Sequence, residues 1–195
     1  MEESQLKTDT KIVIIGGSAG SLEVLMKVLP QMPDRISFAL VIVLHRKAGD
    51  DSILEELIAL KTAIPVGEVD DKTPLLPGFI YIAPSDYHLL FEKDGLLSLD
   101  ASEKINFSRP SIDVSFESAA EAYQHDVTGI LLSGANSDGT NGLKSIKKNG
   151  GIIAIQNPET AEMPYMPRSA AENTTPDYIL DVDGILELIC RSNTI

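Results

Sequence analysis

The sequence contains little of what marks a secreted or membrane-spanning protein. A single cysteine, Cys190, stands among 195 residues, which excludes an internal disulfide framework and favours a reducing cytoplasm. No hydrophobic run approaches the roughly 18 residues that span a membrane, and the acidic start Met1-Glu2-Glu3 is unlike a signal peptide. We therefore expect a cytoplasmic protein that does not insert into a membrane.

Basic residues are also scarce. The chain has 16 lysines and arginines against 29 aspartates and glutamates, a net charge of −13. This balance argues against nonspecific binding to nucleic acid, which needs cations to neutralise phosphates. Cysteine and histidine do not occur in a metal-ligand spacing, which argues against a structural zinc site. The hydrophobic content of 43% and the charged content of 23% are ordinary for a soluble globular protein.

Strand-like and helical patterns alternate along most of the chain. A strand predicted at 11–15, with β-branched residues at 12–15, and a continuous apolar run at 38–44 are typical of buried parallel strands, and residues 21–29 have helical apolar spacing. Asp94-Gly95 is a two-residue turn signal that predicts a β-hairpin over residues 88–100. These patterns predict an α/β fold, with a doubly wound, mostly parallel sheet, helices on both faces and a β-hairpin insertion.

We expect one domain. Residues 1–10 are polar and predict a flexible N-terminal leader, whereas residues 11–195 show no break in composition, no repeat and no low-complexity tract. A chain of this length can bury one substantial core. Residues 11–195 are therefore predicted to form a single domain.

The turn after the first predicted strand carries the strongest functional signal. Its residues Gly16-Gly17-Ser18-Ala19-Gly20 fit the pattern G-x-S-x-G, in which a nucleophilic serine lies between a strand and a helix. Glycines suit such a turn because it needs strained backbone angles and a close approach of the substrate. Two other interpretations stay open: Ser18 could cap the helix, or the turn could cradle a phosphate. Neither G-x-G-x-x-G nor a Walker lysine pattern is present, which weakens the phosphate interpretation.

A histidine and an aspartate occupy comparable positions at two other predicted strand ends. His45 ends the apolar run at 38–44, and Asp138 follows a predicted strand at 127–132. Ligands of open α/β sheets bind beyond the carboxyl ends of the strands, so we expect Ser18, His45 and Asp138 to converge there. His45 would accept the proton of Ser18 as general base, and Asp138 would orient the imidazole, as in a serine-hydrolase triad.

Alternatives stay open for each of these residues. Taken alone, His45 is more often a hydrogen-bonded structural residue, and Asp138 is more often a helix cap. Asp113 is the chief rival to Asp138 as the orienting acid, although its place in an amphipathic helix indicates a structural role. His88 and His125 are weaker candidates for the base.

Six motifs follow one another along the chain: I-I-G-G-S-A-G-S (14–21), V-I-V-L-H (41–45), L-P-G-F-I-Y-I-A-P-S-D-Y-H (76–88), F-S-R-P-S-I-D-V-S-F-E-S (107–118), G-I-L-L-S-G-A-N-S-D-G (129–139) and M-P-R-S-A (166–170). With these motifs in this order, the chain closely resembles the catalytic domain of CheB-type chemotaxis methylesterases over about residues 11–188. The resemblance implies a Rossmann-like α/β fold without metal or cofactor. It places the family's triad on Ser18, His45 and Asp138.

The resemblance also implies an activity and a protein substrate. The family hydrolyses glutamate γ-methyl esters on the cytoplasmic helices of methyl-accepting chemoreceptors and releases methanol. Many members also deamidate specific glutamines. Typical members carry a receiver domain before the esterase domain, for which this chain has no room. We therefore expect a stand-alone catalytic domain that a separate response regulator or another signalling partner can control.

Several residues are predicted to stabilise the oxyanion or to contact the substrate. The amide of Ala19 is the first candidate oxyanion donor, although many family members have threonine at this position. Ala135 replaces a methionine whose amide serves the oxyanion hole in the family, and Ala135 still offers that amide. Met166, Arg168 and Arg109 are further candidates for packing or substrate contacts, and salt bridges to nearby acids stay open for both arginines.

Two other functions stay open. The altered residues beside Ser18 and Asp138 motivate a noncatalytic interaction module in a signalling complex. The turn Gly16–Ser21 motivates a nucleotide or phosphate binder.

Overall fold

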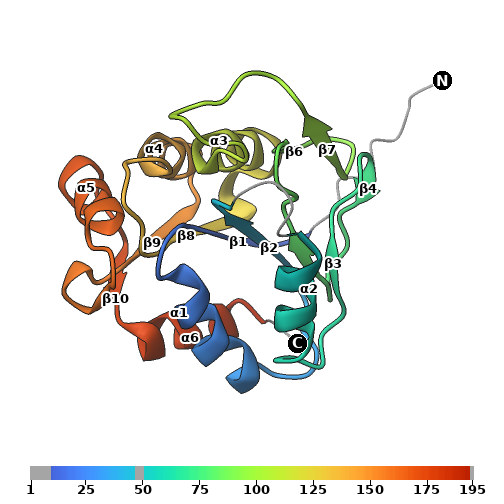
Figure 1. Ribbon diagram of the computed structural model, residues 1–195, viewed down its shortest axis with the longest axis horizontal. Coiled ribbons are helices and arrows are strands. Elements are labelled where there is room, and N and C mark those ends of the chain that lie inside the picture. The colour runs from blue at the N-terminus through green and yellow to red at the C-terminus, as the bar shows by residue number, and fades with distance from the viewer. Residues whose placement is uncertain (1–9, 47–50, 194–195) are drawn as a thin grey trace.

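The computed structural model describes residues 10–46 and 51–193 of the chain, with Asp51 and Ser52 described by their backbone alone (Figure 1). Of the leader predicted over residues 1–10, only Thr10 belongs to the described part. Within these ranges, strands and helices alternate through most of the chain.

Within the described residues, seven parallel strands form the main sheet in the order β10-β9-β8-β1-β2-β5-β3. Their bounds are β1 Ile12–Gly17, β2 Ala39–Leu44, β3 Val66–Glu68, β5 Ile80–Ile82, β8 Val127–Leu131, β9 Ile152–Gln156 and β10 Tyr178–Leu180. β1 and β2 are buried along their whole length because helices cover both faces of the sheet, which explains their continuous apolar runs. The predicted mostly parallel sheet is confirmed.

Helices cover both faces of this sheet (Figure 1). One face carries α1 (Ser21–Val28), α2 (Asp51–Ala59) and α6 (Val182–Arg191), whose apolar side chains share one buried cluster. The other face carries α3 (Ile112–Tyr123), α4 (Thr140–Lys148) and α5 (Tyr165–Asn173), which share a second buried cluster. The described residues also include the 3₁₀ turns η1 (Leu29–Gln31), η2 (Gln124–Asp126) and η3 (Pro158–Thr160).

The predicted hairpin insertion is confirmed. β6 (His88–Phe91) and β7 (Leu96–Asp100) pair in antiparallel fashion around the Asp94-Gly95 turn, and β4 (Thr73–Pro74) pairs with β7. Sequence periodicity does not predict β4, because a strand of this length has no periodic pattern. The hairpin packs against α3 and joins the buried cluster on that face of the sheet.

The strand order indicates which part of the sheet edge is expected to bind a ligand. From β1 the chain first moves to β2 on one side, and after the hairpin it returns to β8 on the other side. The crevice at such a switch point is where open α/β sheets bind ligands. The residues that directly follow β1, β2 and β8 lie at this edge of the sheet. In the part of the chain that the structure describes, no helix has the length and apolar content needed to cross a membrane.

Candidate active site

Ser18, His45 and Asp138 lie at the carboxyl edge of the sheet. Ser18 comes directly after β1, His45 directly after β2, and Asp138 lies in the loop that joins β8 to α4. Because β8, β1 and β2 are neighbours, hydrogen bonds link the three loops. The amide of His45 donates to the carbonyl of Gly17 at 3.0 Å, and the amide of Ser18 donates to the carbonyl of Ser133 at 2.9 Å.

The turn that carries Ser18 is fixed against the loop after β8. The Ser21 hydroxyl donates to the Ser133 carbonyl at 2.7 Å, so this carbonyl accepts from both serines. Gly20 has φ +84°, and a Cβ there would lie 2.7 Å from Ser133 Oγ, so the turn requires glycine at this position. Gly20, which has no side chain, is the N-cap of α1, and among the described residues the Ser18 hydroxyl accepts no hydrogen bond from the amides of this helix end. The Ser18 hydroxyl therefore does not cap the helix, and the Ser18 amide already has an acceptor that a phosphate would have to displace.

A buried carboxylate holds the His45 ring. His45 Nε2 lies 2.7 Å from Asp138 Oδ2, and the Asp138 side chain is completely buried. Asp138 Oδ2 also accepts the amide N–H of Ile112 at 2.7 Å, and Oδ1 accepts the Ser111 hydroxyl and the Asp113 amide, both at 3.0 Å. These groups form the N-terminus of α3, where the helix dipole and free amides favour a negative charge. The fold thus provides preformed hydrogen-bond donors for an ionised carboxylate at this position.

The ionisation of Asp138 determines which nitrogen of His45 is a base. Burial acts to raise the pKa of the Asp138 carboxyl, but the hydrogen bonds from His45, Ile112 and Asp113 together lower it below its ordinary value. An ionised carboxylate has no proton to donate, so His45 Nε2 must carry the proton that it shares with Asp138. The neutral imidazole then presents the lone pair of Nδ1 as a proton acceptor.

Asp113, the alternative orienting acid, is bound elsewhere. Its Oδ1 accepts the Gly142 amide at 2.7 Å, and its Oδ2 accepts the Asn106 side-chain amide at 3.2 Å. Burial raises the pKa of the Asp113 carboxyl, and the neighbouring Asp138 charge acts in the same direction. Among the described residues, Asp113 makes no hydrogen bond with His45, so the structure places Asp138 and not Asp113 on the imidazole.

The other two histidines have separate surroundings. His88 is buried, accepts the Ser111 amide on Nδ1 at 3.1 Å and donates from Nε2 to the Glu103 carbonyl at 2.9 Å. It therefore supports the N-terminus of α3 on which Asp138 depends. His125 is exposed and lies 3.7 Å from Asp126. In residues 10–46 and 51–193, no cluster of His, Cys, Asp and Glu side chains could hold a metal ion.

The two predicted oxyanion donors, Ala19 and Ala135, are exposed at the same edge. Within the described residues, neither amide N–H donates to a protein acceptor, so each can meet a substrate oxygen. Backbone hydrogen bonds to Met163 and Met166 fix the loop that carries Ala135. The Gly134 amide donates to the Met163 carbonyl at 3.0 Å, and the Gly134 carbonyl accepts the Met166 amide at 2.9 Å.

Met166 and Arg168 have structural contacts. Met166 is fully buried, and a Cβ on Gly134 would lie only 2.6 Å from its sulfur. The Met166 side chain therefore supports the loop from the core and does not reach a substrate at the surface. The Arg168 guanidinium lies 3.3 Å from the Glu159 carboxylate, which is the salt bridge that the sequence left open.

The segment 101–109 forms a wall of the site that sequence patterns do not predict. Arg109 orders this segment by donating to two of its backbone carbonyls, at 2.9 and 2.7 Å. The Asn106 side-chain amide reaches inward, 3.2 Å from Asp113 Oδ2 and 3.5 Å from Asp138 Oδ1. No sequence signal marks this contact, because it joins an irregular loop to two carboxylates on other elements.

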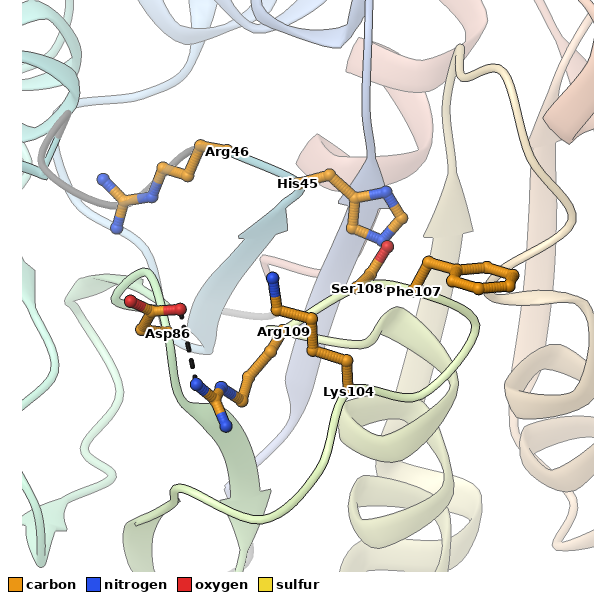
Figure 2. Close-up of a pocket in the computed structure, with 7 residues that line it drawn as sticks. All are labelled: His45, Arg46, Asp86, Lys104, Phe107, Ser108 and Arg109. Atoms are coloured by element: carbon orange, nitrogen blue, oxygen red, sulfur yellow. Dashed lines mark hydrogen bonds and ion pairs between the residues drawn. The ribbon is translucent and has the colours of Figure 1, made fainter.

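Two cavities lie beside His45. One, of about 320 Å³, contains Ser18 and is walled mainly by apolar side chains of α1, β2 and α2. The other, of about 420 Å³, is walled by the segment 101–109 together with Asp86 (Figure 2). His45 and Arg46 line both cavities. Ser18 and His45 thus face a common space that a substrate can enter.

The fold and the site define a doubly wound α/β protein with a serine, a histidine and a carboxylate at one sheet edge, the side-chain types that serine hydrolases combine. Comparison with known families gives the particular family. The model described as CheB methylesterase matches residues 13–189. The chain therefore belongs to the CheB methylesterase family.

Individual relatives agree with this assignment. A protein of Leptospira interrogans is 45% identical over 183 residues, which cover 92% of this chain and 93% of the relative. A protein of Thermotoga maritima named protein-glutamate methylesterase/protein-glutamine glutaminase is 35% identical over 180 residues, or 91% of this chain and 52% of the relative. The crystal structure of the Thermotoga maritima CheB methylesterase catalytic domain matches with a TM-score of 0.89 and 34% identity, over 93% of this chain and 98% of that chain. The resemblance noted in the sequence is confirmed.

Proposed function

We propose that the chain is a protein-glutamate methylesterase and protein-glutamine glutaminase that acts in the cytoplasm on methyl-accepting chemoreceptors. The observation that carries the proposal is the pair of His45 with the buried Asp138 carboxylate, 2.7 Å apart, beside the cavity that holds Ser18. The family and the name of the Thermotoga maritima relative support the substrate class. Cys190 is a free thiol, which suits a reducing compartment.

Ser18 is the nucleophile in this mechanism. Its Oγ attacks the carbonyl carbon of the glutamate γ-methyl ester while its proton passes to Nδ1 of His45, the ring nitrogen that does not face Asp138. The resulting imidazolium is stabilised by the ionised Asp138 carboxylate. The amides of Ala19 and Ala135 donate to the oxygen that becomes negative in the tetrahedral intermediate.

Collapse of the intermediate breaks the bond to the methoxy group. His45 returns the proton to this leaving group, methanol departs, and a glutamyl ester of Ser18 remains. A water molecule then attacks this acyl-enzyme, His45 accepts its proton, and the products are the glutamate carboxylate and the free Ser18 hydroxyl. With glutamine as substrate, ammonia leaves in place of methanol, and the later steps are the same.

In this mechanism the hydrogen bond between Ser18 and His45 forms when the substrate binds. In the described structure the two residues line one cavity without a direct hydrogen bond. Such catalytic hydrogen bonds commonly tighten only in the substrate complex. In our proposal the Ser18 hydroxyl turns toward His45 Nδ1 as the ester enters the cavity.

Methanol release from methylated receptor fragments tests the proposed function. We expect the wild type to release methanol and Ser18→Ala to lose about 10⁴-fold in rate, because the nucleophile is gone. Ser145→Ala on α4, away from the site, is the matched control and should retain the wild-type rate. Equal release by the wild type and Ser18→Ala would show that Ser18 is not the nucleophile.

A further inference from the structure

The two cavities beside His45 adjoin each other, and we call the surface that they form together the recognition groove. His45 and Arg46 line both cavities. His45 therefore lies in the middle of the groove and not at a closed end. A protein substrate whose ester reaches His45 continues past the reacting carbon on both sides, and its neighbouring side chains meet both halves of the groove.

One half of the recognition groove is apolar. Around Ser18 it is lined by Leu22 of α1, Leu44 of β2, and Ile53 and Leu57 of α2. Ile53 is 59% exposed and Leu57 is 39% exposed, so α2 presents apolar side chains to water directly beside the nucleophile. Exposed apolar side chains gathered beside a functional site are typical of a contact surface.

The other half carries an excess of positive charge. Arg46, Lys104 and Arg109 line it together with Asp86 (Figure 2). Arg46 is paired with Glu68 at 2.8 Å, and Arg109 lies 3.5 Å from Asp86. Lys104 has no ion pair with another described residue, and Figure 2 shows its amine directed into the pocket. On a chain with a net charge of −13, this lysine offers an attractive position for a carboxylate.

The loop that carries Lys104 is held in a fixed shape. Backbone hydrogen bonds of 3.1 and 2.9 Å join Ile105 and Ser108. Between them Asn106 and Phe107 adopt φ values of 49° and 63°. Left-handed backbone is costly for such residues and persists where the surrounding structure holds it. The contact of the Asn106 amide with the buried carboxylates provides that anchor, and Phe107, 99% exposed, projects from the tip.

An amphipathic helix fits the two halves together. Residues three and four apart lie on one face of a helix, so one helix can present apolar side chains on one flank and carboxylates on the other. We propose that α2 and Lys104 fix the orientation of the substrate helix in the recognition groove, with the apolar flank of the helix against α2 and an acidic flank against Lys104. This inference rests on the proposed function, because the ester lies between the two flanks at His45.

Reversing the charge at position 104 and on the substrate peptide tests the proposed contact of the acidic flank. The substrates are two synthetic helical peptides with a central glutamate γ-methyl ester and leucines on one flank, one with glutamates and the other with lysines on the opposite flank. The measured quantity is the ratio of kcat/KM for the acidic peptide to kcat/KM for the basic peptide, which cancels any general loss of activity. The variants are Lys104→Glu and, as control, Lys148→Glu at the far end of α4.

We expect the wild type and Lys148→Glu to prefer the acidic peptide equally. Lys104→Glu should lower the ratio about tenfold. The new glutamate would repel the acidic peptide, which Lys104 attracts, and would attract the basic peptide, which Lys104 repels. The ratio of kcat/KM values measured for the wild type should also move toward one at high salt, because salt screens exposed charges. An unchanged ratio in Lys104→Glu, or an equal change in Lys148→Glu, would overturn the proposed orientation.

A second pair of variants tests the apolar flank. Ile53→Ser removes apolar surface from the recognition groove, whereas Leu60→Ser removes an 80% exposed leucine that lies just beyond α2 and does not line the groove. We expect Ile53→Ser to lower kcat/KM about fivefold for both peptides through a higher KM, and Leu60→Ser to retain the wild-type value. Equal behaviour of the two variants would overturn the inference.

Two outcomes separate this inference from its rivals. If the apolar half is instead covered by a second copy of this chain, sedimentation will show a wild-type dimer that Ile53→Ser dissociates, and the inference is wrong. The hydrolysis of p-nitrophenyl acetate by the wild type and Ser18→Ala tests the chemistry separately. Equal hydrolysis by the wild type and Ser18→Ala would refute the proposed function. If hydrolysis depends on Ser18 but Lys104→Glu leaves the peptide ratio unchanged, only the proposed orientation in the recognition groove is refuted.

Discussion

Replacing Asp138 by asparagine should remove activity through the tautomer of His45. Asp138 Oδ1 accepts hydrogen bonds from the Ser111 hydroxyl and the Asp113 amide, so the oxygen of an asparagine amide will remain on that side. Its NH₂ group will then face His45 Nε2, which has to become the acceptor. The ring proton moves to Nδ1, which can no longer take the proton of Ser18. We expect kcat to fall about 10⁴-fold, as for wrong-tautomer variants of other triads.

The same substitution should destabilise the fold. The new NH₂ group would face the Ile112 amide, which now donates to Asp138 Oδ2 at 2.7 Å and would lose its acceptor. A buried donor without a partner costs about 1–3 kcal/mol. Loss of the negative charge at the N-terminus of α3 removes about 0.3–2 kcal/mol more. The free energy of unfolding should therefore fall by about 1–5 kcal/mol.

Urea unfolding and methanol release measure the two effects of Asp138→Asn. Asp126→Asn, beside the exposed His125, is the matched control and should change neither quantity appreciably. The reasoning is refuted if Asp138→Asn retains a kcat within tenfold of the wild type while remaining folded. That result would mean that the Asp138 carboxylate does not set the proton position on His45.

The destabilisation by Asp138→Asn should depend on pH in a defined direction. Burial opposes ionisation of Asp138, but its hydrogen bonds outweigh burial and lower its pKa in the folded protein. A lowered folded pKa contributes stability that is fully present above the unfolded carboxyl pKa and is lost as the pH falls through the folded value. The difference in unfolding free energy between the wild type and the variant should therefore narrow in acid. A difference that widens in acid would contradict this account.

Three further substitutions test the support of the site. Gly139→Ala should cost about 2–4 kcal/mol in urea unfolding, because φ is +93° and the new Cβ would lie 2.6 Å from a Leu131 methyl group; a neutral effect would contradict this packing. Met166→Ala should cost about 2–5 kcal/mol because its side chain is fully buried, and a change confined to KM would instead support a substrate contact. Arg168→Ala should change the unfolding free energy by less than about 1 kcal/mol and kcat/KM by less than about threefold, because its exposed ion pair with Glu159 is weak; a larger loss of kcat/KM would restore its predicted role.

The position of the candidate triad followed from strong local signals. The apolar runs before Ser18 and His45 predict buried parallel strands, and such strands end at a common sheet edge. The observed strands β1 and β2 differ from the predicted ranges by one or two residues, which is the usual uncertainty of an element boundary. The order of neighbouring strands is a long-range property, and the sequence pattern left it open.

The support around the site could not be predicted in the same way. The Asn106 amide reaches the Asp113 and Asp138 carboxylates from an irregular loop, and such a contact has no period or turn signal. Phe107 at the loop tip is an apolar residue that a sequence pattern would assign to a core. Met166 is the opposite case, because its position in a motif predicted a contact with the substrate, and its apolar side chain is buried beneath Gly134.

Covalent labelling with a fluorophosphonate tests the central claim most directly, because this reagent reacts with serines that a neighbouring base activates. The wild type should be labelled once, and peptide mass spectrometry should place the adduct on Ser18. His45→Gln should remain unlabelled under the same conditions. An adduct on Ser108, which also lies beside His45 in the pocket of Figure 2, or an unlabelled wild type, would contradict the assignment of Ser18 as the activated nucleophile.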